Sequence, residues 1–140
     1  MGSRRKSREC AMQMLYQWEL SGSTPEQVRT SFLADKKLDT DVEHFACELF
    51  NGVVKEIARL DLLVREHAEN WRLERMAAVD RNILRVALYE LLCHPETPPP
   101  AVINEALEIA RRFSGEDSVE FVNGVLDGIR KSFGSTKSNS

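Results

Sequence analysis

The sequence predicts an all-α protein of about seven helices. Its apolar residues recur at helical spacing in almost every stretch, and the alternation that indicates strands is absent. Capping signals also recur along the chain. Because 140 residues with 42% hydrophobic content can bury one core, we expect a single domain over residues 1–133, followed by a disordered polar tail over 134–140.

The first half of the chain carries three helix-start patterns. A helix over residues 4–20 should present an apolar stripe and end at Ser21-Gly22-Ser23. Thr24-Pro25-Glu26-Gln27 has the cap, first-position proline and closing glutamine of a capping box. Thr40-Asp41-Val42-Glu43 is read as another capping box, which begins a long helix with apolar positions as far as Ile57. A shorter apolar run follows at Leu60–Val64.

The second half contains the most apolar helix. A connection is expected around Trp71-Arg72-Leu73, and residues 77–93 are apolar nearly all round, which is typical of a central buried helix. Pro98-Pro99-Pro100 is expected to be a stiff, extended connector. Residues 102–113 should form the next helix, ended by Ser114-Gly115, and 118–129 the last.

The last predicted helix contains an unusual pair, Asn123-Gly124. A glycine inside a helix costs roughly 1 kcal/mol relative to alanine, and Asn-Gly is normally a turn signal. The pair therefore indicates a close backbone approach, or an amide directed at a neighbour. We assign both residues to packing.

Composition limits the functional class. The net charge is −3 and the pI is about 5.7, so any contact with nucleic acid must use a local basic patch. No apolar stretch is long enough to span a membrane, and no secretory signal is evident. Three widely separated cysteines suggest reduced thiols in a cytoplasmic protein.

Motifs for catalysis are missing from the sequence. It has no nucleophile elbow, phosphate-binding glycine loop or dinucleotide fingerprint. His44, His67 and His94 have no partner at metal-ligand spacing. We therefore expect no enzymatic activity, no metal and no cofactor.

A dense cation cluster begins the chain, at Arg4, Arg5, Lys6 and Arg8. It is either a solvated helix end or a binding patch. Cations at a helix N-terminus are unfavourable because they oppose the helix dipole. Their presence there favours a role in binding a partner, and phosphates are the obvious partner.

Six further positions are of interest, two of them aromatic and four charged. Tyr16 lies one position off the first apolar stripe, and Phe121 lies off the last one, so partner contact and core packing are both open for each ring. Asp117 fits a helix cap with Glu120 three residues on. Beside Asp80, the pair Arg81 and Arg85 is suited either to internal ion pairs or to a partner surface.

Three segments of the sequence resemble the NusB family of bacterial transcription antitermination factors. The matching strings are Arg4–Trp18 (RRKSRECAMQMLYQW), Val79–Leu91 (VDRNILRVALYEL) and Val102–Asp127 (VINEALEIARRFSGEDSVEFVNGVLD). The resemblance spans nearly the whole chain, and the last string is the most specific.

The resemblance implies two three-helix bundles packed together with an N-terminal arginine-rich helix. It also implies a partner, the ribosomal small-subunit protein NusE. The heterodimer would bind the single-stranded boxA element of ribosomal RNA leader transcripts and, with other Nus factors, keep RNA polymerase from terminating early.

The resemblance also implies site residues. Arg4, Arg5, Lys6 and Arg8 would hold RNA phosphates, and Asp117 and Phe121 would contact boxA bases. Tyr16 and Asp80, with Arg81 and Arg85 beside them, would face NusE. Asp80 stands where a glutamate is expected, which leaves its contact open but not its charge.

Two alternatives accompany this interpretation. A NusB-like module also forms the N-terminal part of RNA cytosine methyltransferases, although those chains are much longer. The protein could instead be a homodimeric interaction protein that has lost RNA binding.

Overall fold

The computed structural model describes the backbone of residues 2–68 and 73–138, and the side chains of residues 4–68 and 73–133. Within those ranges every regular element is a helix, and no strand is present. The elements are α1 (Gly2–Ser21), α2 (Pro25–Leu33), α3 (Thr40–Lys55), α4 (Ile57–His67), the 3-10 turn η1 (Leu73–Arg75), α5 (Ala78–Cys93), α6 (Pro99–Phe113) and α7 (Glu116–Ser138). The predicted all-α fold is confirmed.

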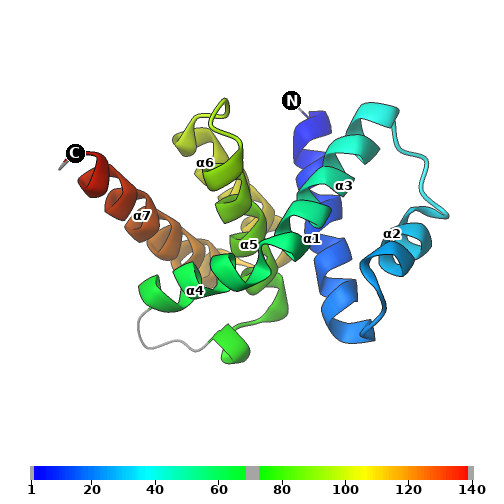
Figure 1. Cartoon of the computed structure of the whole chain (residues 1–140), viewed down its shortest axis with the longest axis horizontal. Helices are drawn as coiled ribbons and strands as arrows, with labels where there is room; N and C mark the ends of the chain where they lie inside the picture. The colour runs from blue at the N-terminus through cyan, green and yellow to red at the C-terminus, as the bar shows by residue number, and fades with distance from the viewer. Residues whose placement is uncertain (1, 69–72, 139–140) are drawn as a thin grey trace.

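The helices form two groups that share one core. In Figure 1, α1, α2 and α3 lie together on the right, while α5, α6 and α7 pack on one another toward the left. Helix α4 packs on α5 and α7, and α1 packs on α5, which joins the two groups. Buried residues from both groups belong to one hydrophobic cluster, and α5 is its centre because nine of its residues are buried.

Local sequence signals explain the start of α2 and the buried face of α7. Thr24 accepts a hydrogen bond from the Gln27 backbone and the Gln27 side chain accepts one from the Thr24 backbone, so the predicted capping box begins α2. On α7, the predicted apolar stripe of Val119, Val122, Leu126 and Ile129 is buried.

Three boundary predictions were wrong. Thr40 is the first helical residue of α3 rather than its cap; Asp39 precedes it and its side chain makes no capping hydrogen bond. The long helix predicted from this point divides at Glu56, where the backbone leaves the helical region (φ −100°, ψ 17°). Pro99 and Pro100 form the first turn of α6, because proline has no N–H to lose there and its φ already suits a helix.

The last helix also differs from the prediction at both ends. It begins at Glu116, so Asp117 lies inside the first turn and is not the cap. It continues through Ser138, past the predicted end at Ile129 and into the segment expected to be disordered. No proline interrupts that segment, and Gly134 weakens the helix without ending it. Of the predicted connection near Leu73, Trp71 and Arg72 lie outside the described residues.

None of the described helices is long and apolar enough to cross a membrane. Cys10, Cys47 and Cys93 are free thiols.

Candidate nucleic-acid interface

The cations at the start of α1 differ in exposure and in partners. Arg4, Arg5 and Arg8 lie on adjoining sides of the helix, because residues three and four positions apart are neighbours, and Lys6 lies on another side. Arg4 is exposed and lies over the Phe45 ring of α3, with its guanidinium carbon 3.9 Å from the ring centroid. Lys6 is exposed. Arg5 instead points toward α6.

Arg8 departs from its expected role. Its guanidinium forms two hydrogen bonds to the Glu90 carboxylate of α5, at 2.5 and 2.9 Å, and its side chain is only 9% exposed. A buried cation that is already paired has little capacity left for a phosphate. We therefore assign Arg8 to the contact between the two helix groups and leave it out of the proposed RNA surface.

A line of ion pairs leads from α1 across α6 to the start of α7. Arg5 binds Glu105 of α6 through two hydrogen bonds of 2.8 Å, which lower the pKa of Glu105, and this Arg5 side chain remains 43% exposed. Seven residues further along α6, or about 10 Å, Arg112 binds Glu9 of α1 at 2.9 Å. Arg111 then binds Glu116, the first residue of α7, at 3.1 Å.

Arg111 and Arg112 were not singled out from the sequence. Their side chains are 45% and 65% exposed, so both still present donors to solvent. The signal was weak because two arginines in the last turn of a helix are what the helix dipole favours in any protein. Their position is informative only once α1 and α6 are seen to be paired.

The start of α7 borders a hollow of about 410 Å³ beside the start of α5. Its lining residues are Met76, Ala77, Asp80, Asp117, Ser118, Glu120 and Phe121. The structure thus brings together Asp117 and Phe121, the two residues expected to contact bases. Three carboxylates and one aromatic ring converge there, which suits an unpaired base carrying an amine far better than a phosphate.

Each of these side chains has a distinct setting. Asp117 is exposed in the first turn of α7, where a negative charge complements the helix dipole. Phe121 is half-buried: it packs against the core and also lines the hollow, so both sequence alternatives apply in part. Asp80, which was expected to face a protein partner, is 9% exposed and accepts a 3.1 Å hydrogen bond from the Ser118 hydroxyl. It belongs to the hollow rather than to an open surface.

The packing role predicted for Asn123 and Gly124 was wrong. Both residues are exposed, and a Cβ built on Gly124 would meet no atom within 4 Å. The close approach occurs elsewhere, at Gly52 of α3, where a Cβ would overlap the Tyr89 ring of α5. Gly124 lowers the stability of the helix by about 1 kcal/mol relative to alanine, and no packing contact among the described residues requires a glycine there.

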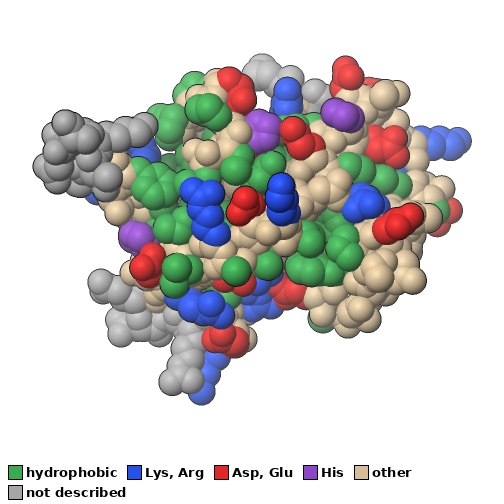
Figure 2. Space-filling view, in the orientation of Figure 1, with side chains coloured by type: hydrophobic (Ala, Val, Ile, Leu, Met, Phe, Trp, Pro, Cys, Tyr) green, Lys and Arg blue, Asp and Glu red, His purple; other side chains and the backbone are tan. Residues whose placement is uncertain are grey.

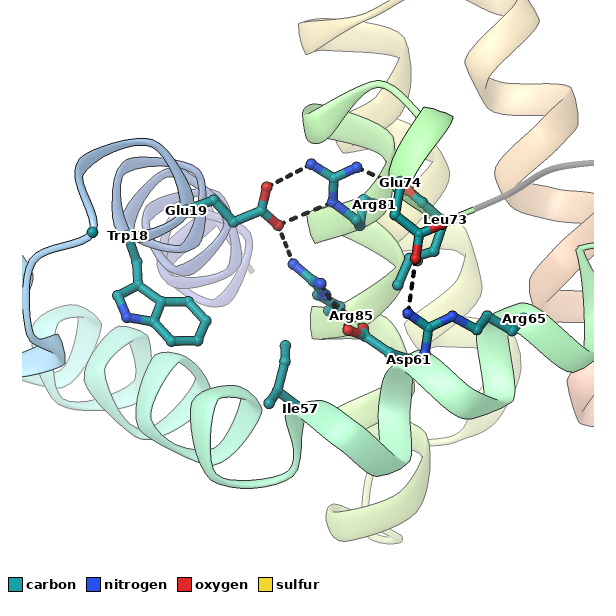
Figure 3. Close-up of a pocket in the computed structure, with 10 residues that line it drawn as sticks. Trp18, Glu19, Ile57, Asp61, Arg65, Leu73, Glu74, Arg81 and Arg85 are labelled. Atoms are coloured by element: carbon teal, nitrogen blue, oxygen red, sulfur yellow. Dashed lines mark hydrogen bonds and ion pairs between the residues drawn. The ribbon is translucent and has the colours of Figure 1, made fainter.

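The arginines expected beside the partner surface form an internal network instead. Figure 3 shows the Glu19 carboxylate between Arg81 and Arg85, and Arg85 also binds Asp61 at 2.8 and 2.9 Å. Arg81 donates further to the carbonyl oxygens of Leu73 and Met76. Burial alone would raise the pKa of Glu19, but the two arginines outweigh it and lower that pKa. The internal ion-pair alternative therefore holds for Arg81 and Arg85.

This network borders a hollow of about 630 Å³ between α1, α4 and α5. Trp18 lines it, and Arg65 pairs with Glu74 at its edge (Figure 3). The opposite charges in this hollow neutralise one another, so it offers no site for an anion. Tyr16 is different: it is 39% exposed and lies two helical turns from Glu9 on the same side of α1.

Figure 2 shows acidic and basic side chains interspersed over the face that it presents, in keeping with the net charge of −3. Among the described residues no three His, Cys, Asp or Glu side chains are arranged so that they could hold a metal ion.

Comparison with known proteins decides the family. The NusB family model matches residues 5–131. The transcription antitermination protein NusB of Koribacter versatilis is 52% identical over 131 residues, covering 93% of this chain and 90% of that protein. The chain belongs to the NusB family. The NusB protein of Solibacter usitatus is 45% identical over 135 residues, covering 94% of this chain and 90% of that one.

Solved NusB structures share the fold along its whole length. A crystal structure of T. maritima NusB superposes with a TM-score of 0.84 at 37% identity, covering 91% of this chain and 90% of that one. A crystal structure of the antitermination factors NusB and NusE in complex with double-stranded RNA has a TM-score of 0.86 at 28% identity, covering 94% and 98%. The arrangement of α1, α6 and α7 is thus a NusB-family arrangement.

Proposed function

We propose that this protein is a non-enzymatic antitermination factor that binds boxA of ribosomal RNA leader transcripts as a heterodimer with NusE. In this role it acts in the cytoplasm on nascent RNA, and its contacts with other Nus factors and RNA polymerase are indirect. The observation that carries the proposal is the line of exposed arginines from α1 across α6, ending at the acidic and aromatic hollow of α7.

The two parts of this surface have separate tasks. Arg5, Arg111 and Arg112 neutralise phosphates, which positions the strand without reading its sequence. Asp117 and Phe121 meet a base: the carboxylate accepts from an exocyclic amine, and the ring stacks on the base plane. Such contacts require unpaired bases, so the proposal favours single-stranded boxA.

The proposed NusE surface rests on Tyr16. An exposed tyrosine is a suitable anchor for a protein partner, because it buries a large rigid ring and keeps a polar hydroxyl. Tyr16 lies two helical turns from Glu9, which pairs with Arg112, so a partner bound at Tyr16 would lie near the proposed path of the strand. A partner that adds its own RNA contacts would raise the affinity of the pair by linkage.

The arginine line is tested by the salt dependence of RNA binding. For the double variant Arg5→Ala/Arg111→Ala, the slope of log affinity against log salt should become shallower by about 1.4, since each phosphate contact to a single strand contributes about 0.7. Arg112 is kept because its removal would leave the buried Glu9 carboxylate without its partner. The measurement is a titration of labelled boxA RNA at several salt concentrations.

The control for this experiment removes two positive charges from outside the interface. Lys55→Ala/Arg59→Ala, at the α3–α4 junction, changes the net charge equally and should leave the slope unchanged. Equal slopes for wild type and Arg5→Ala/Arg111→Ala would exclude these arginines from RNA binding.

The base contact is tested at Phe121. Phe121→Leu keeps an apolar side chain against the core but removes the ring, so affinity for boxA RNA should fall about 5- to 100-fold, corresponding to the loss of one stacked base. Binding to a scrambled RNA and to double-stranded RNA should change much less. The titration is done with and without NusE, and an unchanged boxA affinity in both cases would place base recognition elsewhere.

A further inference from the structure

Position 124 of α7 carries no side chain, although no contact among the described residues requires a glycine there. Gly124 lies in the middle of the helix, is exposed, and has open space where its side chain would be. It therefore weakens the helix without allowing two segments of this chain to approach. This loss of helix stability is explained if another molecule binds against the exposed backbone at Gly124.

The location of Gly124 indicates what binds there. Asp117, Phe121 and Gly124 are spaced four and three residues apart, so they share one face of α7. A helical side chain leans toward the N-terminus and covers the preceding turn. A side chain at position 124 would therefore lie over Glu120 and Phe121, both of which line the hollow.

We propose that Gly124 is a clearance position, which lets the RNA strand lie directly on the backbone of α7 beside the base stacked on Phe121. This inference rests on the proposed function. The strand would leave the hollow by passing over position 124. A ribose or a neighbouring base is the occupant. A phosphate is disfavoured there by the carboxylates of Asp117 and Glu120.

The test compares a small and a large side chain at this position. Gly124→Ala adds a Cβ into open space and should raise the melting temperature by about 3–5 °C while affinity for boxA RNA stays within about threefold of wild type. Gly124→Leu should also raise the melting temperature but weaken boxA binding at least tenfold. Gly124→Gln repeats the large substitution without adding apolar surface. Ser31→Leu, at an exposed position of α2, is the matched control and should bind RNA normally.

The outcomes separate the two proposals. Wild-type RNA affinity for both Gly124→Leu and Gly124→Gln would overturn the clearance position, and if Phe121→Leu still weakens binding, the proposed function stands. If neither Phe121→Leu nor the large substitutions weaken binding, both proposals fail. Loss of NusE binding in the absence of RNA, with RNA affinity retained, would identify this face as a protein contact and would also overturn the inference.

Discussion

Replacing Glu90 by alanine is expected to lower the free energy of unfolding by about 3–5 kcal/mol. The change would leave the Arg8 guanidinium buried, with only Glu105 nearby at 3.7 Å. An uncompensated buried charge is among the most costly defects a core can contain. The measurement is equilibrium urea unfolding of wild type and variant under the same conditions.

A double variant distinguishes the cost of leaving one charge unpaired from the net contribution of the Arg8–Glu90 ion pair to stability. Arg8→Met/Glu90→Leu replaces both charges by apolar side chains of similar size and should recover most of the stability, because attraction within a buried pair is largely offset by desolvation. If Glu90→Ala unfolds within 1 kcal/mol of wild type, Arg8 must reach solvent easily, and our reason for leaving it out of the RNA surface is lost.

The second large effect is expected at Arg85. Arg85→Ala should cost about 3 kcal/mol or more at neutral pH, because the side chain is only 7% exposed and joins Glu19 of α1 to Asp61 of α4. Arg65→Ala is the matched control at the edge of the same hollow. The Arg65–Glu74 pair is 51% and 67% exposed, so its loss should cost at most about 1 kcal/mol.

The Arg85→Ala effect should also depend on pH. The folded protein holds the pKa of Glu19 below its ordinary value of 4.5, so this carboxylate contributes stability above that pH and loses it as the pH falls through the folded pKa. Without Arg85 much of that contribution is already missing. The difference between wild type and Arg85→Ala should therefore be largest at neutral pH and shrink as the pH falls below 4.5. A difference that grows on acidification would contradict this origin.

Elements whose signals are local were predictable from the sequence. The capping box at Thr24 and the buried stripe along α7 depend on residues a few positions apart, and both occur as predicted. The prolines before α6 were misread because the same residue that stiffens an extended segment also suits the first turn of a helix. Which of the two conformations such a proline adopts depends on the residues on either side of it.

The candidate site was harder to predict because its members are defined by distant partners. Arg4, Arg5 and Arg8 are indistinguishable as sequence letters. The structure distinguishes them by their partners: Arg5 binds Glu105, 100 residues away, and Arg8 binds Glu90, 82 residues away. Asp117 and Phe121 were found only through family resemblance, and the residues that connect them to α1, Arg111 and Arg112, had no distinctive sequence signal.

The pairing of α1 with α5 and α6 has a practical consequence for deletion mapping. Shortening the chain from its N-terminus through residue 8 would remove a cation that could hold RNA together with one that neutralises Glu90. Loss of RNA binding by the truncated protein would then have two explanations: removal of an RNA contact, or separation of the two helix groups. Single-residue changes are therefore the appropriate tool for locating RNA contacts at this end of the molecule.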